Sequence, residues 1–197
     1  TQYLAPVAQG LSGDEDELLK VAGFWLRAKQ FDLAGRTVEQ ALEAKQDSFK
    51  YRFFLAEHYA RTRQLDKSEA VLRQAMGLNP DPAHPEIIKT KLALSNVLVR
   101  TARLKEAETL VDEILAEDAK NIDARNAKGR FYLARKDGLN AISEFRVVTE
   151  ERPRFIQGHL NLAQAHILNK EETLALDVLQ QAQSLNPVDE KILMALA

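Results

Sequence analysis

The sequence contains no cysteine, which excludes disulfide bonds and thiolate metal sites. Its 27 basic and 29 acidic residues nearly balance, and the net charge of -2 gives no basic excess for nucleic acid or an anionic membrane. No apolar run approaches the ~18 residues of a membrane-spanning helix. Because the sequence begins at Thr1, the lack of a signal peptide carries no information. Cytoplasm and periplasm both remain open.

Glycine and proline are scarce inside the periodic segments of the sequence. The eight glycines and six prolines fall mostly between them, while Ala, Leu, Glu, Lys, Gln and Arg dominate. These residues favour helices, so the composition predicts an all-α protein.

The same residue types recur every 34 residues along most of the chain. Ala107, Ala141 and Ala175 are separated by this interval, whereas Ser68 and Ala107 are 39 apart, which is one period plus five. Such a period indicates an array of repeated units. The predicted units are 15–48, 49–82, 88–121, 122–155 and 156–189, with an insertion at 83–87.

Three positions of the unit keep their size in all five copies. The eighth is small: Ala22, Ala56, Ser95, Gly129 and Ala163. The twentieth is also small: Ala34, Ser68, Ala107, Ala141 and Ala175. The eleventh is large: Trp25, Tyr59, Leu98, Tyr132 and His166. Small side chains allow two helix backbones to approach closely, and large ones fill the space beside the crossing.

Apolar spacings of three and four residues predict two amphipathic helices per unit, roughly over positions 1 to 14 and 17 to 30. Short polar turns separate them, and Pro80, Pro153 and Pro187 follow second helices, because proline cannot continue a helix. The insertion either lengthens a connection or adds a turn to the third unit's first helix, with Pro85 near its start.

This pattern, seen most clearly in 54–80 and 159–187, resembles the tetratricopeptide repeat family over 15–189. The resemblance implies an all-α, right-handed superhelical array, an α-solenoid of about five helix–turn–helix repeats. Two positions depart from the family pattern: Lys128 at the usually apolar seventh position and His166 at the usually aromatic eleventh.

Both ends of the sequence suggest an excerpt of a longer repeat protein. Residues 1–14 are interpreted as an N-terminal segment, the end of a preceding helix, and Ser12 and Glu15 have the spacing of a capping box. Residues 190–197 either start a sixth unit or form a capping helix.

No motif for catalysis or cofactor binding is present, so we expect neither an enzyme nor a cofactor. The sequence lacks a Walker-type phosphate loop and a Gly-x-Ser-x-Gly elbow. His159 and His166 are seven residues apart, whereas a zinc pair on a helix is usually three or four apart. They are predicted to be core or groove histidines, and no metal site is expected.

The resemblance implies that the first helices line a concave groove, where positions 2, 5, 9 and 12 hold an extended peptide or a partner helix. The candidate groove residues are Phe53, Phe54, Glu57, Leu92, Asn96, Asn126, Arg130, Asn161 and Gln164. Phe53 and Phe54 either anchor a partner or pack against the neighbouring unit. Asn side chains can pair with a peptide backbone, and Arg130 with a carboxylate. The carboxylate clamp of some relatives is incomplete, because Leu92 precedes Asn96.

The sequence therefore predicts a non-enzymatic scaffold that binds a peptide or protein, with no nucleic acid partner. The alternative is a structural or self-association module of a larger repeat protein. Residues 141–167 loosely resemble long repeat arrays of bacterial envelope and polysaccharide-export systems.

Overall fold

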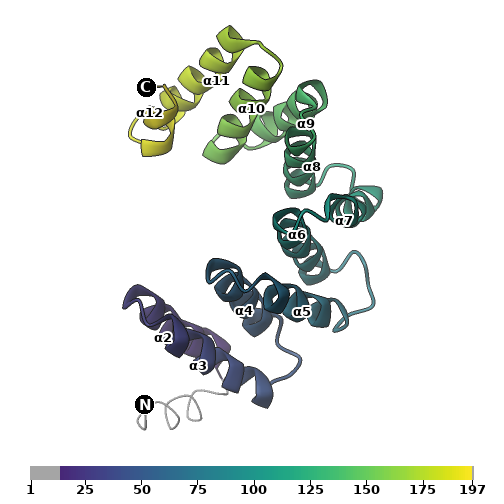
Figure 1. The fold of residues 1–197 in the computed structure, drawn as a ribbon, viewed down its shortest axis with the longest axis vertical. Coiled ribbons are helices and arrows are strands. Elements are labelled where there is room, and N and C mark those ends of the chain that lie inside the picture. The colour runs from purple at the N-terminus through teal and green to yellow at the C-terminus, as the bar shows by residue number, and fades with distance from the viewer. Residues whose placement is uncertain (1–13, 197) are drawn as a thin grey trace. The chain divides into compact units, whose positions relative to one another are not determined.

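The computed structural model describes residues 14–196, which form eleven α-helices and no strand, as predicted (Figure 1). The first six are α2 (Glu15–Arg27), α3 (Phe31–Ala44), α4 (Phe49–Arg61), α5 (Leu65–Met76), α6 (Pro85–Arg100) and α7 (Leu104–Glu117). The others are α8 (Ile122–Ala134), α9 (Gly138–Glu151), α10 (Ile156–Leu168), α11 (Glu172–Leu185) and α12 (Glu190–Leu196). The interpretation of residues 1–14 as a preceding helix end concerns residues that lie, except Asp14, outside the described part of the chain.

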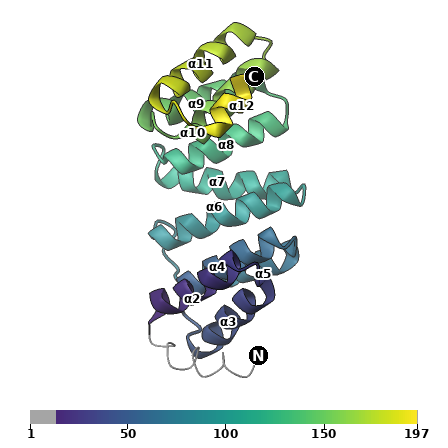
Figure 2. The ribbon, with the colours of Figure 1, turned by 90° about the vertical axis from the view of Figure 1, so that its left-hand side faces the viewer.

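The chain forms two compact units, divided between Thr101 and Ala102, so that the boundary falls inside the third predicted repeat. Helices that follow one another pack together within each unit, such as α4 with α5 and α8 with α9 (Figures 1 and 2). None of the helices in residues 14–196 is long and apolar enough to cross a membrane.

Side chains that accept hydrogen bonds start several of the helices. Asp14 caps α2, because its Oδ1 accepts hydrogen bonds from the backbone N–H groups of Asp16 at 3.0 Å and Glu17 at 3.2 Å. The capping box suggested for Ser12 involves a residue outside the described part of the chain, and helix α2 begins right after Asp14. Ser48 and Asn121 cap α4 and α8 in the same way.

The insertion both lengthens the connection and adds a turn to the third unit's first helix, the two alternatives that the sequence left open. Helix α6 begins at Pro85 and has 16 residues, against 13 in α4, so it gains about one turn. The preceding connection also lengthens, from 45–48 after α3 to 77–84 after α5. Pro85 suits the first position of α6 because the N–H that proline lacks would have no partner within the helix there.

The recurring small residues lie in the core, as the helix-crossing argument requires. All ten residues at the eighth and twentieth positions are buried. In unit 2 a Cβ built on Gly129 would lie 2.7 Å from Cε1 of Phe145, so only glycine allows α8 and α9 this approach. In unit 1 the Ser68 Oγ donates a hydrogen bond to the Ala56 carbonyl at 2.8 Å, which ties the twentieth position of a unit to its eighth.

Lys128, the polar departure at a seventh position, is half-buried and reaches the α7 surface. Its ammonium donates a hydrogen bond to Oδ1 of Asp112 at 2.9 Å. This contact raises the Lys128 pKa, because the carboxylate favours the charged amine. A long side chain with an apolar stem and a paired charge thus replaces the expected apolar residue.

Candidate functional site

Three of the predicted groove residues meet at one hollow in unit 1. A hollow of about 310 Å³ opens between α4 and α6. Its lining residues are Phe53, Ala56, Glu57, Ala60, Ser68, Leu72, Ala93, Asn96, Val97 and Arg100. Most are small or apolar, and Glu57 and Asn96 are the exposed polar members that the sequence predicted.

The half-buried Phe53 ring is held by a row of aromatic rings. Phe49 stacks on Phe53 with ring centroids 6.4 Å apart and on His84 with centroids 6.1 Å apart. His84 also caps α6 through its Nδ1, which accepts a hydrogen bond from the Glu86 N–H at 3.2 Å. The longer connection before α6 therefore supplies His84, which stacks on the ring that packs against Phe53.

Phe54 and Leu92 do not line the hollow. Phe54 packs against the core cluster that contains Leu18 and Tyr51, and its ring stacks on His58 with centroids 6.4 Å apart. Of the two roles considered for Phe54, the structure therefore shows packing.

The charged side chains at the rim of the hollow form an ion pair and a hydrogen bond with neighbouring groups. Glu57 forms an ion pair with Arg61 at 2.6 Å, and the Arg100 guanidinium donates a hydrogen bond to the Ala60 carbonyl at 2.9 Å. Both contacts are exposed to solvent, so they can rearrange around a ligand at little cost.

In unit 2 the predicted asparagines contact one another. Asn161 is only 5% exposed. Its Nδ2 donates to Oδ1 of Asn126 at 3.1 Å, and its Oδ1 accepts from Gln157 at 3.0 Å. Pairing of Asn161 with a peptide backbone would therefore require these two hydrogen bonds to break.

Arg130 and Gln164 are exposed residues on α8 and α10. Although Arg130 is exposed as a whole residue, surrounding protein atoms desolvate its guanidinium, which lowers its pKa. Within residues 14–196, no group of three or more His, Asp or Glu side chains is placed to hold a metal ion.

Comparisons with known proteins agree on this architecture. The tetratricopeptide repeat family model matches residues 26–82. The chain is similar to YrrB, reported as a TPR protein with an unusual peptide-binding site, with 16% identity over 98% of this chain and 97% of that one, at a TM-score of 0.58. Residues 26–82 match the tetratricopeptide repeat family, and the described chain shares the fold of solved tetratricopeptide repeat proteins.

Two further solved structures share the fold. Putative kinesin light chain TPR-like repeats from Podosopora anserina are 15% identical over 89% of this chain and 95% of that one, with a TM-score of 0.72. MamA from Desulfovibrio magneticus RS-1 is 15% identical over 90% and 98%, with a TM-score of 0.66. A search of curated proteins finds no match. At these identities the likeness shows the tetratricopeptide fold alone.

Sequence reasoning missed a set of basic side chains at the fourth position of the tetratricopeptide units. Four of the five units carry one there: Arg52, Lys91, Arg125 and His159. Nε of Arg125 donates to the Ala119 carbonyl at 3.0 Å, and Nε2 of His159 lies 2.8 Å from the Pro153 carbonyl oxygen. These contacts tie a first helix to the connection before it. The recurrence of a basic residue at the fourth position of the units is the sequence signal that could have identified these contacts.

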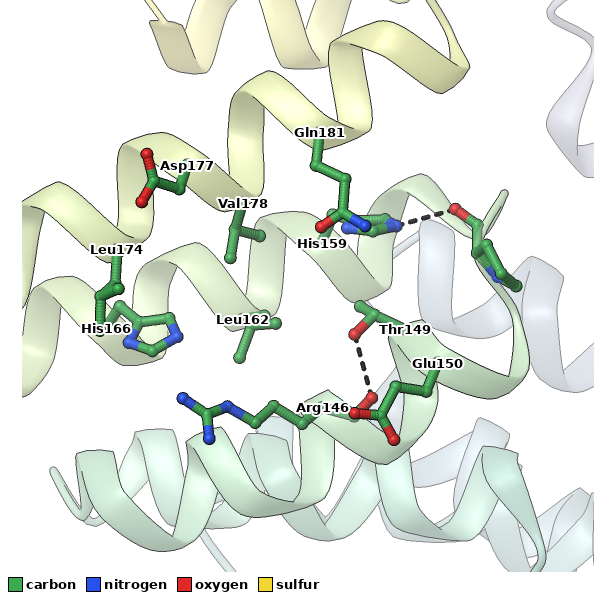
Figure 3. Close-up of a pocket in the computed structure, with 11 residues that line it drawn as sticks. Arg146, Thr149, Glu150, His159, Leu162, His166, Leu174, Asp177, Val178 and Gln181 are labelled. Carbon is green, nitrogen blue, oxygen red and sulfur yellow. Dashed lines mark hydrogen bonds between the residues drawn. The ribbon is translucent and has the colours of Figure 1, made fainter.

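A second hollow, of about 620 Å³, lies in unit 2 along α9, α10 and α11 (Figure 3). Its lining residues are Arg146, Thr149, Glu150, Pro153, His159, Leu162, His166, Leu174, Asp177, Val178 and Gln181. His159 and His166 are each 2% exposed. His166 stands where other tetratricopeptide units of this chain place Trp25, Tyr59 and Tyr132, and a smaller ring at this position leaves space beside α10.

Proposed function

We propose that the chain is a non-enzymatic scaffold that binds a peptide or protein partner in the unit 1 hollow between α4 and α6. The observation that carries the proposal is the meeting of Phe53, Glu57 and Asn96 at one hollow. All three stand at repeat positions that the tetratricopeptide resemblance assigns to the groove.

The chemistry of the hollow favours one apolar side chain of a partner peptide. Ala56, Ala60, Ala93 and Val97 give an apolar lining, and the Phe53 ring offers a flat aromatic surface. A buried anchor in such a pocket typically supplies most of the binding energy of a peptide. The Asn96 amide is able to donate to and accept from the backbone of the partner.

The similarity to YrrB supports this proposal at the level of the fold. A peptide-binding site is reported for YrrB, and at 16% identity the shared fold indicates only that such repeats can present one.

The test begins with selection of peptides from a displayed random library on the immobilised full chain. The Kd of a selected peptide is then measured by fluorescence anisotropy for the wild type and for Ala93→Leu, which fills the hollow without removing a polar contact. We expect Ala93→Leu to weaken binding at least tenfold.

Ala70→Leu is the matched control, because it makes the same substitution at an exposed position of α5 outside the hollow. It is expected to bind like the wild type. If the selected peptides bind Ala93→Leu as tightly as Ala70→Leu, the hollow is not the binding site.

Self-association is the second candidate function, and exposed apolar side chains near α12 favour it. Val188 is 87% exposed and Met194 is 79% exposed. Light scattering should then show a mass that rises with concentration and stays monomeric in Met194→Glu. A constant monomer mass for the wild type would remove this candidate.

A further inference from the structure

The hydrogen bonds of His159 determine which of its ring nitrogens carries a proton. Nε2 lies 2.8 Å from the Pro153 carbonyl oxygen, and a carbonyl oxygen can only accept. Nε2 therefore carries the proton in the neutral ring, and Nδ1 is left with a lone pair. Nδ1 is buried, and no residue in 14–196 provides it with a hydrogen-bond partner. An unsatisfied buried acceptor is unusual, and a donor that enters the hollow is one way to satisfy it.

His166 presents a second bare nitrogen by the same reasoning. Its Nδ1 lies 2.7 Å from Oε2 of Glu171, and an ionised carboxylate can only accept. The pKa of Glu171 is lowered by this hydrogen bond, which is consistent with an ionised carboxylate. Nε2 of the neutral ring is then unprotonated, and in Figure 3 the ring is directed into the hollow.

The other polar groups of the hollow include charges of both signs and the Gln181 amide, which can both donate and accept. Glu150 on α9 and Asp177 on α11 add two carboxylates, and the Arg146 guanidinium opposes them with one positive charge. Between the two histidines, Leu162 shares their face of α10 and meets Val178, so the middle of the hollow is apolar (Figure 3). The hollow thus combines the two histidine rings and a net negative charge with a short apolar floor.

We propose that this hollow binds an organic ammonium group on an alkyl stem, the chemistry shared by polyamines and lysine side chains. The ammonium group supplies three donors and a positive charge, and the stem covers Leu162 and Val178. The site lies on other helices than the peptide hollow of unit 1 and does not depend on it.

Two other ligand classes fit the hollow less well. An oxyanion would bring its own lone pairs against two unprotonated ring nitrogens and two carboxylates. A single metal ion cannot bridge the histidines, since seven residues of helix span about 10.5 Å and zinc binds nitrogen at about 2 Å.

The test uses the full chain and follows the imidazole C–H signals of His159 and His166 by NMR during titration. Hexylamine and hexanoate are compared first, because they share a stem and differ in the sign of their charge. Hexylamine should shift both signals, and hexanoate should shift neither. Equal binding of hexanoate would overturn the proposal.

Spermidine and N-acetyl-lysine methylamide then distinguish the two sources of the ammonium group. Binding of spermidine alone assigns the site to free polyamines, and binding of the lysine derivative alone assigns it to lysine side chains of a protein. If neither compound binds, the proposal fails.

Variants locate the site. Asp177 is exposed, so Asp177→Asn should leave the melting curve unchanged and weaken amine binding at least threefold. His166→Tyr should fill the hollow and abolish binding. His84→Asn, which keeps a capping side chain in unit 1, is the control and should bind like the wild type. Unchanged affinity in Asp177→Asn would place the amine elsewhere.

Discussion

Two glycine-to-alanine substitutions in helices should change the free energy of unfolding in opposite directions. Of the two, Gly129→Ala should destabilise unit 2. In a helix interior, alanine is favoured over glycine by about 1 kcal/mol. Against this gain, the new Cβ would lie 2.7 Å from Cε1 and Cζ of Phe145, a ring with no exposed surface. Overpacking of this kind costs roughly 1–3 kcal/mol. The net expectation is a loss of about 1 kcal/mol.

Gly23→Ala is the matched substitution without the clash. Gly23 lies inside α2, and among residues 14–196 the side-chain atom nearest its new Cβ would be Nη1 of Arg27, at 3.7 Å, an ordinary contact distance. The helix preference then acts alone, so Gly23→Ala should stabilise by up to about 1 kcal/mol. Thermal denaturation followed by circular dichroism separates the two, since 1 kcal/mol shifts Tm by about 2–4 °C in a domain of this size.

A double variant tests the cause of the loss. Phe145→Leu removes the ring atoms that the new Cβ would meet, so Gly129→Ala should cost less in that background than in the wild type. If Gly129→Ala raises Tm as Gly23→Ala does, the argument from close helix approach is refuted.

Two other predictions concern the turns and the Tyr59 hydroxyl. Lys136 has a φ of 61° in the turn between α8 and α9, a left-handed conformation that glycine adopts without strain, so Lys136→Gly should raise the urea midpoint by the equivalent of up to about 1 kcal/mol. Burial and a hydrogen bond from its hydroxyl to Glu39 raise the pKa of Tyr59. Its contribution is therefore complete below the unfolded value of about 10 and is lost as pH rises toward the folded-state pKa. Tyr59→Phe should cost about 1 kcal/mol at pH 8, and the difference in urea midpoint should shrink by pH 11, whereas a constant difference would contradict the shift.

The repeat positions could be predicted from the sequence because their cause lies in the backbone. Two helices that approach closely exclude large side chains at the crossing. Residues 129 and 141 must therefore be small, whichever rotamers the neighbouring side chains adopt. The all-α fold and the buried helix contacts follow from this rule, as does termination of second helices near proline.

The details of the candidate site depended on side-chain directions that spacing does not determine. Phe53 and Phe54 are adjacent on α4, and a rotation of about 100° between them sends one ring to the hollow and the other to the core. Asn161 was predicted to meet a peptide, and the repeat pattern did not indicate that its amide donates a hydrogen bond to Asn126 in the neighbouring repeat. Such contacts depend on which rotamer each neighbour adopts, and the repeat pattern carries no information about this.

The substitution His166→Tyr tests how the hollow along α9, α10 and α11 affects the stability of unit 2. Tyr59, at the same position of the second unit, donates its hydroxyl hydrogen to Glu39, and Arg146 occupies the position of Glu39 in the fourth unit. A tyrosine at 166 would fill space beside Leu162 and accept a hydrogen bond from Arg146, although the hydrogen bond to Glu171 would be lost. Since that lost bond is worth about 1–2 kcal/mol and burial of a larger ring contributes about 2 kcal/mol, the variant should be as stable as the wild type or slightly more stable. A urea midpoint well below that of the wild type would show that the His166–Glu171 hydrogen bond contributes more to stability than filling the space beside it.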